Sequence, residues 1–269
     1  MTETYVTSAQ LQRVRDQLIP LDQALIDTLA IVDYATSDQL QRLVLPRTST
    51  LARARRVRRR LQHLRERRVV YTLERRIGGY GGGSPQSIHT LDRAGLQLTS
   101  STHPRRVRPA RDRGRAHVNH ALDVTQHRVD LDTYAATHDG VRVVLWQGEP
   151  GCHVPFRELG RLARLSQDAL VTVDTPTERI TSMLEVDRDT HSLPTLLQKA
   201  DRYLGYAAPR PETPQVVISM TNPGRAERLA TALHHPHRPP QLSQLAQQLF
   251  VITTRKEAIA ALAGQEVAT

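Results

Sequence analysis

Residues 47–68, with the sequence RTSTLARARRVRRRLQHLRERR, combine a helical apolar period with a high density of arginine. Apolar side chains recur at three- and four-residue spacing, at Leu51, Ala54, Val57, Leu61 and Leu64. This spacing predicts one helix with an apolar stripe that packs against other elements. The rest of its surface carries Arg53, Arg55, Arg56, Arg59, Arg60 and Arg67. Because such a positive field is relieved by a polyanion, we expect this helix to bind DNA; the alternative is a solvated arginine face.

The positive charge is concentrated in the first half of the chain. Only two of its 37 basic residues are lysines, so the arginine content by itself reflects a general bias. Residues 1–118 hold 22 basic and 10 acidic side chains, whereas residues 119–269 hold 15 and 17. A length of 269 residues suits two domains. We therefore expect a nucleic-acid-binding module joined to a near-neutral domain.

Several classes of protein do not fit the sequence. Cys152 is the only cysteine, which excludes a disulfide framework and a cysteine zinc cluster. No apolar run approaches the roughly 20 residues that cross a bilayer, and residues 1–10 lack the order of a secretion signal. We expect a cytoplasmic protein with no membrane partner.

His234, His235 and His237 lie around a proline and are expected to form a solvated loop rather than a metal site.

The first half has the element order of a winged helix. After a polar lead-in at residues 1–19, helical patterns beginning at Pro20, at Thr36–Ser37 and at Thr48 or Ser49 follow one another closely. Strand formers then lead into a glycine-rich tip, flanked by Arg75 and Arg76, and into a second extended run. We predict a winged helix-turn-helix DNA-binding domain over residues 20–99, with the arginine helix in the major groove.

The second half predicts a compact α/β domain over residues 117–269, joined by a basic linker at residues 100–116. A helix with an imperfect period begins this domain, and the sequence VRVVLW predicts a buried strand after it. Further strands and helices are expected in the segments DALVTV, RITSMLEVD, PTLLQKADRYLGY, PQVVISM, RAERLATAL, FVITT and KEAIAAL.

Acidic residues at strand ends suggest a metal site. Asp168 begins one predicted strand, and Glu185 and Asp187 end the next, both on one strand face. If these strands are neighbours, Asp168 and Glu185 converge on one hard cation, and Mg²⁺ is held by one or two carboxylates with water and phosphate. Lys199 in the following helix would stabilise a charged transition state. Ordinary strand-end carboxylates are the alternative.

Sequence elements in both halves carry a family resemblance. They are the ALDV run at 121–124 preceded by His117 or His120, Trp146 to Glu149, the Asp168–Ala169 pair, Leu184 to Arg188 with the sequence LEVDR, and Lys199 to Tyr203. In this order, after a winged helix and a linker, they resemble the replication-relaxation family of plasmids and mobile elements, whose second half resembles the PD-(D/E)xK nuclease fold.

The resemblance implies roles for three residues. Asp168 matches the Asp of the PD element and Glu185 the acidic residue of the ExK element. Asp187 occupies the lysine position and Gln167 the proline position, so a nuclease needs Lys199 to supply the missing cation. A noncatalytic nuclease-like scaffold explains the same residues, and we favour it over an active enzyme.

The resulting hypothesis is a double-stranded DNA-binding protein of a plasmid or mobile element that acts in replication or in relaxation and mobilisation. Its expected partners are duplex DNA and plasmid replication or relaxosome proteins. A Mg²⁺-dependent endonuclease or nickase is one alternative, with Asp168 and Glu185 as metal ligands and these two residues and Lys199 as catalytic residues. A winged-helix transcription regulator is the other, because the fold serves both roles. No heptad pattern indicates the oligomeric state.

Overall fold

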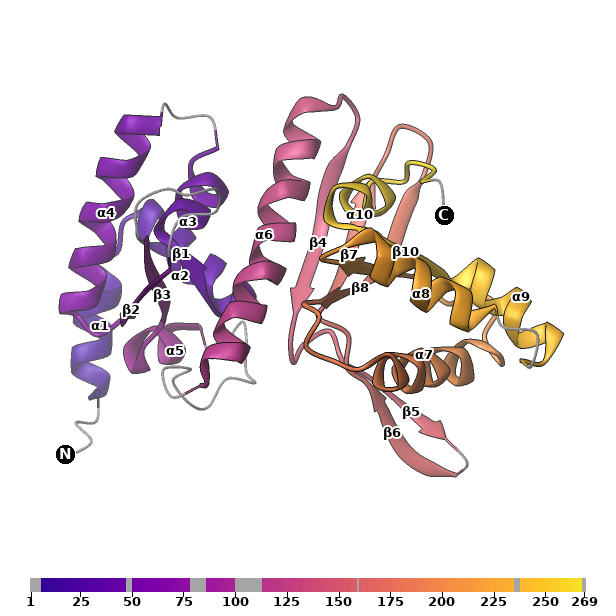
Figure 1. Ribbon diagram of the computed structural model, residues 1–269. Coiled ribbons are helices and arrows are strands. Elements are labelled where there is room, and N and C mark those ends of the chain that lie inside the picture. Colours follow the sequence, from indigo (N-terminus) through magenta and orange to yellow (C-terminus); the bar gives the residue numbers. More distant parts are fainter. Residues whose placement is uncertain are drawn as a thin grey trace. The chain divides into compact units, whose positions relative to one another are not determined.

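The computed structural model describes residues 6–46, 50–77, 86–99, 113–158, 160–234 and 238–267. The side chains of residues 74–77 and 158 lie outside this description. Contacts divide the chain into two compact units, one ending at Val129 and the other beginning at Asp130, so that the boundary falls within a long helix (Figure 1). Both units combine helices with sheet, which confirms the mixed helix and sheet class.

The N-terminal unit contains a helical group followed by a β-hairpin, as predicted. Its elements are α1 (Ser8–Asp16), α2 (Pro20–Val32), β1 (Ala35–Thr36), α3 (Ser37–Val44), α4 (Thr50–Glu66), β2 (Val70–Ile77), β3 (Gln86–Leu91), α5 (Arg93–Thr99) and the first part of α6 (Arg115–Thr137). Both β1 and β2 pair antiparallel with β3. Helix α1 lies within the segment that the sequence analysis treated only as a polar lead-in.

A capping box in the sequence fixes the start of helix α3 in this unit. Thr36 caps α3 by accepting a hydrogen bond from the Gln39 backbone N–H at 3.2 Å, and Gln39 Oε1 accepts from the Thr36 N–H at 2.9 Å. The Gln39 side chain also donates to the Leu122 carbonyl at 2.9 Å. This bond ties α3 to the first part of α6, a helix that the sequence analysis assigned wholly to the second domain.

The apolar stripe of α4 is shorter than predicted. Val57, Leu61 and Leu64 are buried in one core with residues of α2, whereas Leu51 is 78% exposed. Leu51 lies in the first turn of α4, which begins at Thr50. The prediction that Leu51 belongs to the core is therefore wrong, because the core covers only the later turns of the helix.

His89 joins three elements of the N-terminal unit. Its Nε2 lies 2.9 Å from Ser37 Oγ in α3, and its Nδ1 lies 3.0 Å from Thr72 Oγ1 in β2. The side chain is buried, and this burial, together with the charge of Arg65, lowers the pKa of His89 to about 4. The ring is therefore neutral in the folded protein at neutral pH.

We expect the N-terminal unit to lose stability as the pH falls from about 6.5 towards about 4. Over this range the unfolded chain protonates His89 while the folded chain does not, so protons favour unfolding, by up to about 3 kcal/mol. The free energy of unfolding is measured by urea denaturation at several pH values, with hydrogen exchange of the β3 amides as the readout for the N-terminal unit. His89→Gln should flatten this pH dependence even if it lowers stability overall; an unchanged slope would exclude His89 as its source.

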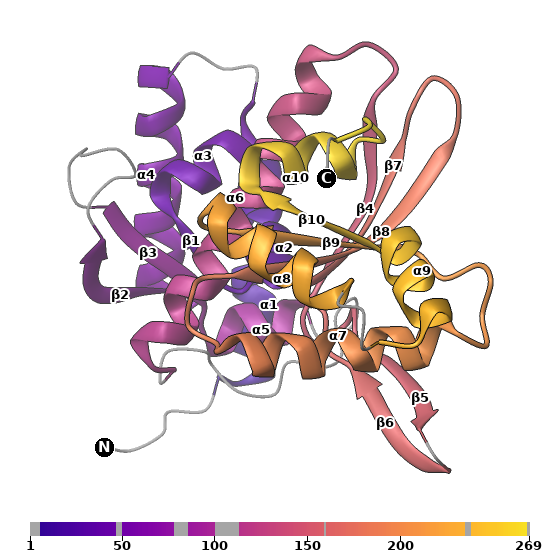
Figure 2. The same ribbon diagram turned by 45° about the vertical axis from the view of Figure 1, so that its right-hand side comes forward.

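The C-terminal unit is built around a five-stranded mixed sheet of order β10-β9-β8-β7-β4 (Figure 2). Strands β8, β9 and β10 are parallel neighbours, and β4 and β7 extend the sheet antiparallel. The elements are the last part of α6, β4 (Arg142–Gly148), β5 (Val154–Glu158), β6 (Arg161–Leu165), β7 (Ala169–Asp174), β8 (Arg179–Asp187), α7 (Leu193–Ala207), β9 (Gln215–Met220), α8 (Pro223–Leu233), α9 (Pro240–Leu249), β10 (Phe250–Thr254) and α10 (Arg255–Leu262).

One core joins helices to the central strands of this sheet. Leu204 of α7 and Leu229 of α8 pack with Met183, Val216 and Ile218 of β8 and β9. Strand β4, predicted to be buried, is instead the edge strand, where Val144 and Leu145 are more than 40% exposed. Strands β5 and β6 and helix α9 were not predicted. None of the helices in the described ranges has the length and apolar character needed to cross a membrane.

Candidate nucleic-acid interface and carboxylate site

Helix α4 presents an arginine-rich outer face in the N-terminal unit. We call its exposed arginines the arginine surface: Arg55, Arg56, Arg58, Arg59 and Arg65. The helix can carry these charges because its opposite side is held by the buried residues Val57, Leu61 and Leu64. Arg58 and Arg65 were not among the arginines predicted to bind DNA, although their spacing from the apolar stripe places them outside the core.

Arg60 is not part of this exposed surface. Its Nε donates to Asp22 Oδ1 at 2.7 Å, and its Nη2 contacts Asp22 Oδ2. Asp22 is fully buried and also accepts a hydrogen bond from the Ile19 N–H at 3.0 Å, at the start of α2. The hydrogen bond to Asp22 raises the pKa of Arg60. The structure therefore places Arg60, predicted to bind DNA, in an ion pair that joins α4 to α2.

The other arginines predicted to bind DNA have different settings. Arg67 donates to Gln17 Oε1 at 3.0 Å and contacts His63 Nδ1 at 3.0 Å. Arg53 is partly buried near the start of α4. Arg75 and Arg76 lie in β2, but their side chains and the glycine-rich tip fall outside the described residues. Within α4, Arg55, Arg56 and Arg59 thus remain the exposed members of the predicted set.

Two acidic residues of the C-terminal unit lie across neighbouring strands. Strands β7 and β8 pair with Ala169 opposite Leu184, so Asp168, just before β7, lies next to Glu185. Asp168 Oδ2 accepts a hydrogen bond from the Val186 N–H at 2.7 Å. Both side chains are more than 90% buried. The condition set by the sequence, that these two strands are neighbours, is therefore met.

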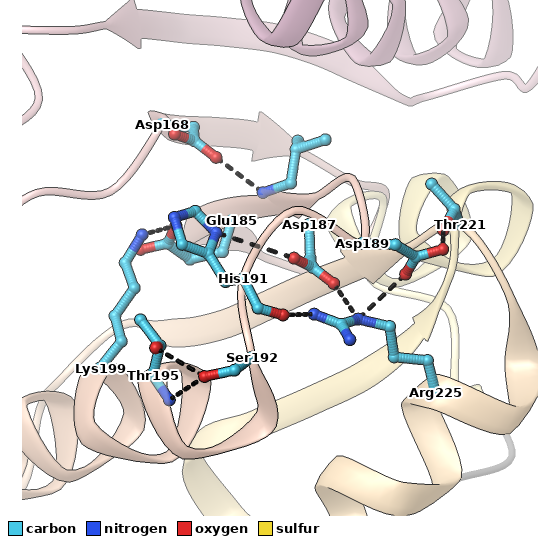
Figure 3. A network of polar contacts seen from close by, with 11 residues as sticks. Asp168, Glu185, Asp187, Asp189, His191, Ser192, Thr195, Lys199, Thr221 and Arg225 are labelled. Carbon is cyan, nitrogen blue, oxygen red and sulfur yellow. Dashed lines mark hydrogen bonds and ion pairs between the residues drawn. The ribbon is translucent and has the colours of Figure 1, made fainter. Parts of the chain in front are cut away.

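Helix α7 supplies Glu185 with two partners, and Figure 3 shows one of them, Lys199. Lys199 Nζ contacts Glu185 Oε2, and the Tyr203 hydroxyl donates to Glu185 Oε1. Lys199 and Tyr203 are one helical turn apart and so face the same strand. The Lys199 side chain is 42% exposed, against 7% for Glu185. We call Asp168, Glu185 and Lys199 the carboxylate site. The sequence placed Tyr203 only in the family pattern and did not predict its contact with Glu185.

Burial and nearby charges shift the protonation of this site. Burial, reinforced by the charge of Asp168, raises the pKa of Glu185 to about 7, while Lys199 and Tyr203 oppose the shift. Burial alone would lower the pKa of Lys199, but Glu185 and Asp168 outweigh it and raise that pKa. Glu185 therefore exchanges a proton near neutral pH beside a lysine that keeps its charge. A buried carboxyl group with a raised pKa beside a charged partner is typical of functional sites and also occurs in structural ion pairs.

Asp187 belongs to a separate network on α8, not to Lys199. Arg225 Nε contacts Asp187 Oδ2 and lies 2.9 Å from Asp189 Oδ1, and Arg225 Nη2 donates to the His191 carbonyl (Figure 3). The hydrogen bond to Asp187 raises the pKa of Arg225. Asp187 occupies the lysine position of the predicted nuclease motif, and here a buried ion pair neutralises it.

Among the described residues, the other candidate groups form no metal or nucleophile site. In the described part of the chain, no three His, Cys, Asp or Glu side chains are grouped so as to hold a metal ion. His234 follows the last residue of α8, whereas His235 and His237 lie outside the described residues. Cys152 is buried and donates to the Gln167 carbonyl at 2.9 Å, and burial raises the pKa of its thiol to about 12. A thiol in this setting is inert.

Comparisons with known proteins identify the family. The family model described as replication-relaxation matches residues 27–219, which include α4, the hairpin of the N-terminal unit and the whole carboxylate site. No curated protein and no solved structure matches the chain. Because the match covers more than half of the sequence, the chain belongs to the replication-relaxation family.

Proposed function

We propose that this protein binds double-stranded DNA through the arginine surface of α4 and acts in the replication or relaxation of a plasmid or other mobile element. The observation that carries the proposal is the exposure of Arg55, Arg56, Arg58, Arg59 and Arg65 on one helix whose other side is buried. A duplex offers phosphates that neutralise such a surface and release counterions on binding. Membership of the replication-relaxation family supports the biological role.

The order of elements supports a winged-helix mode of binding. Helices α2, α3 and α4, with β1 after α2, precede the β2–β3 hairpin, and β1 pairs with β3. In winged helices the third helix enters the major groove, and the hairpin reaches the adjacent backbone. In this interpretation α4 is the recognition helix, and Arg75 and Arg76 in β2 approach the phosphates.

A salt titration of binding tests the proposal. The full chain should bind a labelled duplex with an affinity that falls steeply as salt rises, because several phosphates are neutralised. Heparin of similar charge serves as the competitor. Binding to duplex DNA no better than to heparin, or binding insensitive to salt, would contradict the proposal. Mapping the bound site then separates an origin or transfer region from a promoter, which would instead support the transcription regulator.

Cleavage of DNA is the second candidate function, and the carboxylate site is the observation that favours it. Asp168 and Glu185 supply two hard carboxylates, which is within the number that Mg²⁺ takes from a protein. Each oxygen of Glu185 already accepts one hydrogen bond and keeps a second lone pair. The donor set therefore fits the ion: Asp168 and Glu185 would hold Mg²⁺, which would polarise a phosphate. Lys199 would offset negative charge on that phosphate.

The competing hypothesis is a noncatalytic scaffold, which we continue to favour. In a scaffold, Lys199 and Tyr203 remain the permanent partners of Glu185, and Arg225 remains paired with Oδ2 of Asp187. Such ion pairs can hold helices against a sheet in a domain that catalyses no reaction. The two hypotheses use the same contacts and differ in whether the site processes DNA.

A nicking assay separates them. If the domain is an enzyme, the protein should nick supercoiled plasmid in Mg²⁺ or Mn²⁺, and Asp168→Ala, Glu185→Ala and Lys199→Ala should each lower the rate by about 100-fold or more. Lys256→Ala, which removes the other, exposed lysine, is the matched control and should leave the rate unchanged. An inactive wild-type protein supports the scaffold, and activity that survives all three changes indicates a contaminating nuclease.

A further inference from the structure

Strands β5 and β6 form a two-stranded arm separate from the five-stranded sheet. Figures 1 and 2 both show this β5–β6 arm projecting beyond α7 from the rest of the C-terminal unit. The base of the arm is closed by two hydrogen bonds between Cys152 and Gln167, one from the Cys152 thiol and one from the Gln167 amide. Asp168 of the carboxylate site follows Gln167 directly.

One face of the arm is anchored in the core. Val154, Phe156, Ala163 and Leu165 pack into the apolar core of the unit. The Phe156 ring meets Tyr206 of α7 edge to face, with ring centroids 5.5 Å apart. These contacts hold the arm in place, so its other face is presented on a fixed support.

The outward face is basic around one exposed apolar side chain. The register places Arg157 opposite Leu162 and Arg164 opposite Pro155, and all four alternate with the anchored residues. Leu162 is 81% exposed, and Arg157 and Arg164 on the same face are exposed as well. Glu158 is the single acidic residue of the arm. In the described residues no ion pair involves Arg157 or Arg164, whereas Arg142 and Arg179 share Asp174.

We propose that the outward face of the β5–β6 arm is a second contact surface for duplex DNA, distinct from α4. A two-stranded ribbon fits the major groove. Arg157, across from Leu162 on β5, and Arg164, two residues further along β6, suit phosphates beside that groove. The charge of the arm complements DNA and offsets the repulsion that Asp168 and Glu185 exert on a nearby phosphate. The proposal rests on the proposed DNA-binding function and adds a second surface to it.

The first test is a pair of double variants of the full chain. Arg157→Gln with Arg164→Gln should weaken duplex binding about tenfold at 0.1 M salt and lower the salt slope by about 1.8, because each neutralised phosphate contributes about 0.9 to that slope. Arg157→Lys with Arg164→Lys should restore most of the binding. The matched control, Arg142→Gln with Arg179→Gln, removes the same charge from β4 and β8 and should leave affinity unchanged. Equal losses in the arm and control variants would overturn the proposal.

The second test detects contact directly. Leu162→Cys introduces an exposed thiol into a chain whose own Cys152 is buried, so a photo-crosslinker attaches at the arm. Cross-linking to a bound duplex is expected there and not at Gln248→Cys on the exposed side of α9. If the chain binds duplex but the arm does not cross-link, the arm proposal fails while the proposed function stands. If the chain binds no duplex, both fail.

Discussion

Replacement of Arg55, Arg56 and Arg59 by glutamine should weaken duplex binding by about 100-fold or more, because each arginine that binds DNA contributes roughly 1–3 kcal/mol. The slope of log affinity against log salt should also fall by about 0.9 for each phosphate that is no longer neutralised. These three side chains are exposed and lie outside the buried stripe of α4, so folding should be unaffected. Fluorescence anisotropy with a labelled duplex over a salt series measures both quantities.

The control for this variant removes the same charge elsewhere. Arg142, Arg179 and Arg228 are exposed arginines of the C-terminal unit, and their joint replacement by glutamine should change affinity little. The comparison matters because the chain carries a net charge of +10, which by itself attracts polyanions. If both triple variants lost affinity equally, binding would reflect net charge, and α4 would not be the DNA-binding surface.

Substitutions at the neighbouring residues Arg59 and Arg60 should affect different properties. The change at Arg60 should lower stability, and the change at Arg59 should weaken DNA binding. Arg60→Met leaves Asp22 buried without its counter-ion, and removal of one partner of a buried ion pair costs about 3–5 kcal/mol. Arg59→Met, at an exposed position, should change the free energy of unfolding by no more than about 0.5 kcal/mol. Urea unfolding followed by hydrogen exchange of α2 and α4 amides measures the difference, and anisotropy should show weakened binding for Arg59→Met.

A second-site change tests the cause of this destabilisation. Asp22→Asn combined with Arg60→Met removes the buried charge while keeping a side-chain oxygen to accept the Ile19 N–H. We expect this double variant to regain most of the stability lost by Arg60→Met alone. If the double variant were as unstable as the single one, packing of the Arg60 side chain, rather than the stranded charge of Asp22, would explain the loss.

Local patterns account for the elements that were predicted correctly. The three-helix order, the hairpin, β7, β8, α7 and β9 follow from apolar periods and from caps such as Thr36, which involve residues only a few positions apart. The placement of Asp168 beside Glu185 needed one further condition, that two consecutive strands pair, which consecutive strands commonly do. The arm was missed because β5 and β6 have only five residues each and β5 contains Pro155, which weakens a strand prediction.

Sequence by itself determined most of the helix and strand pattern, the arginine density of α4 and the acidic strand ends, because each depends on composition and short-range spacing. Only the tertiary structure decided which charges are free. Asp22 is 38 residues from Arg60, and Arg225 is 38 residues from Asp187, so neither ion pair is visible in any local pattern. Strand β4 likewise has a strand-like sequence whose edge position depends on the order in which distant strands pair. Burial makes such pairings decisive, because a charge removed from water must be matched by a partner that the fold brings to it.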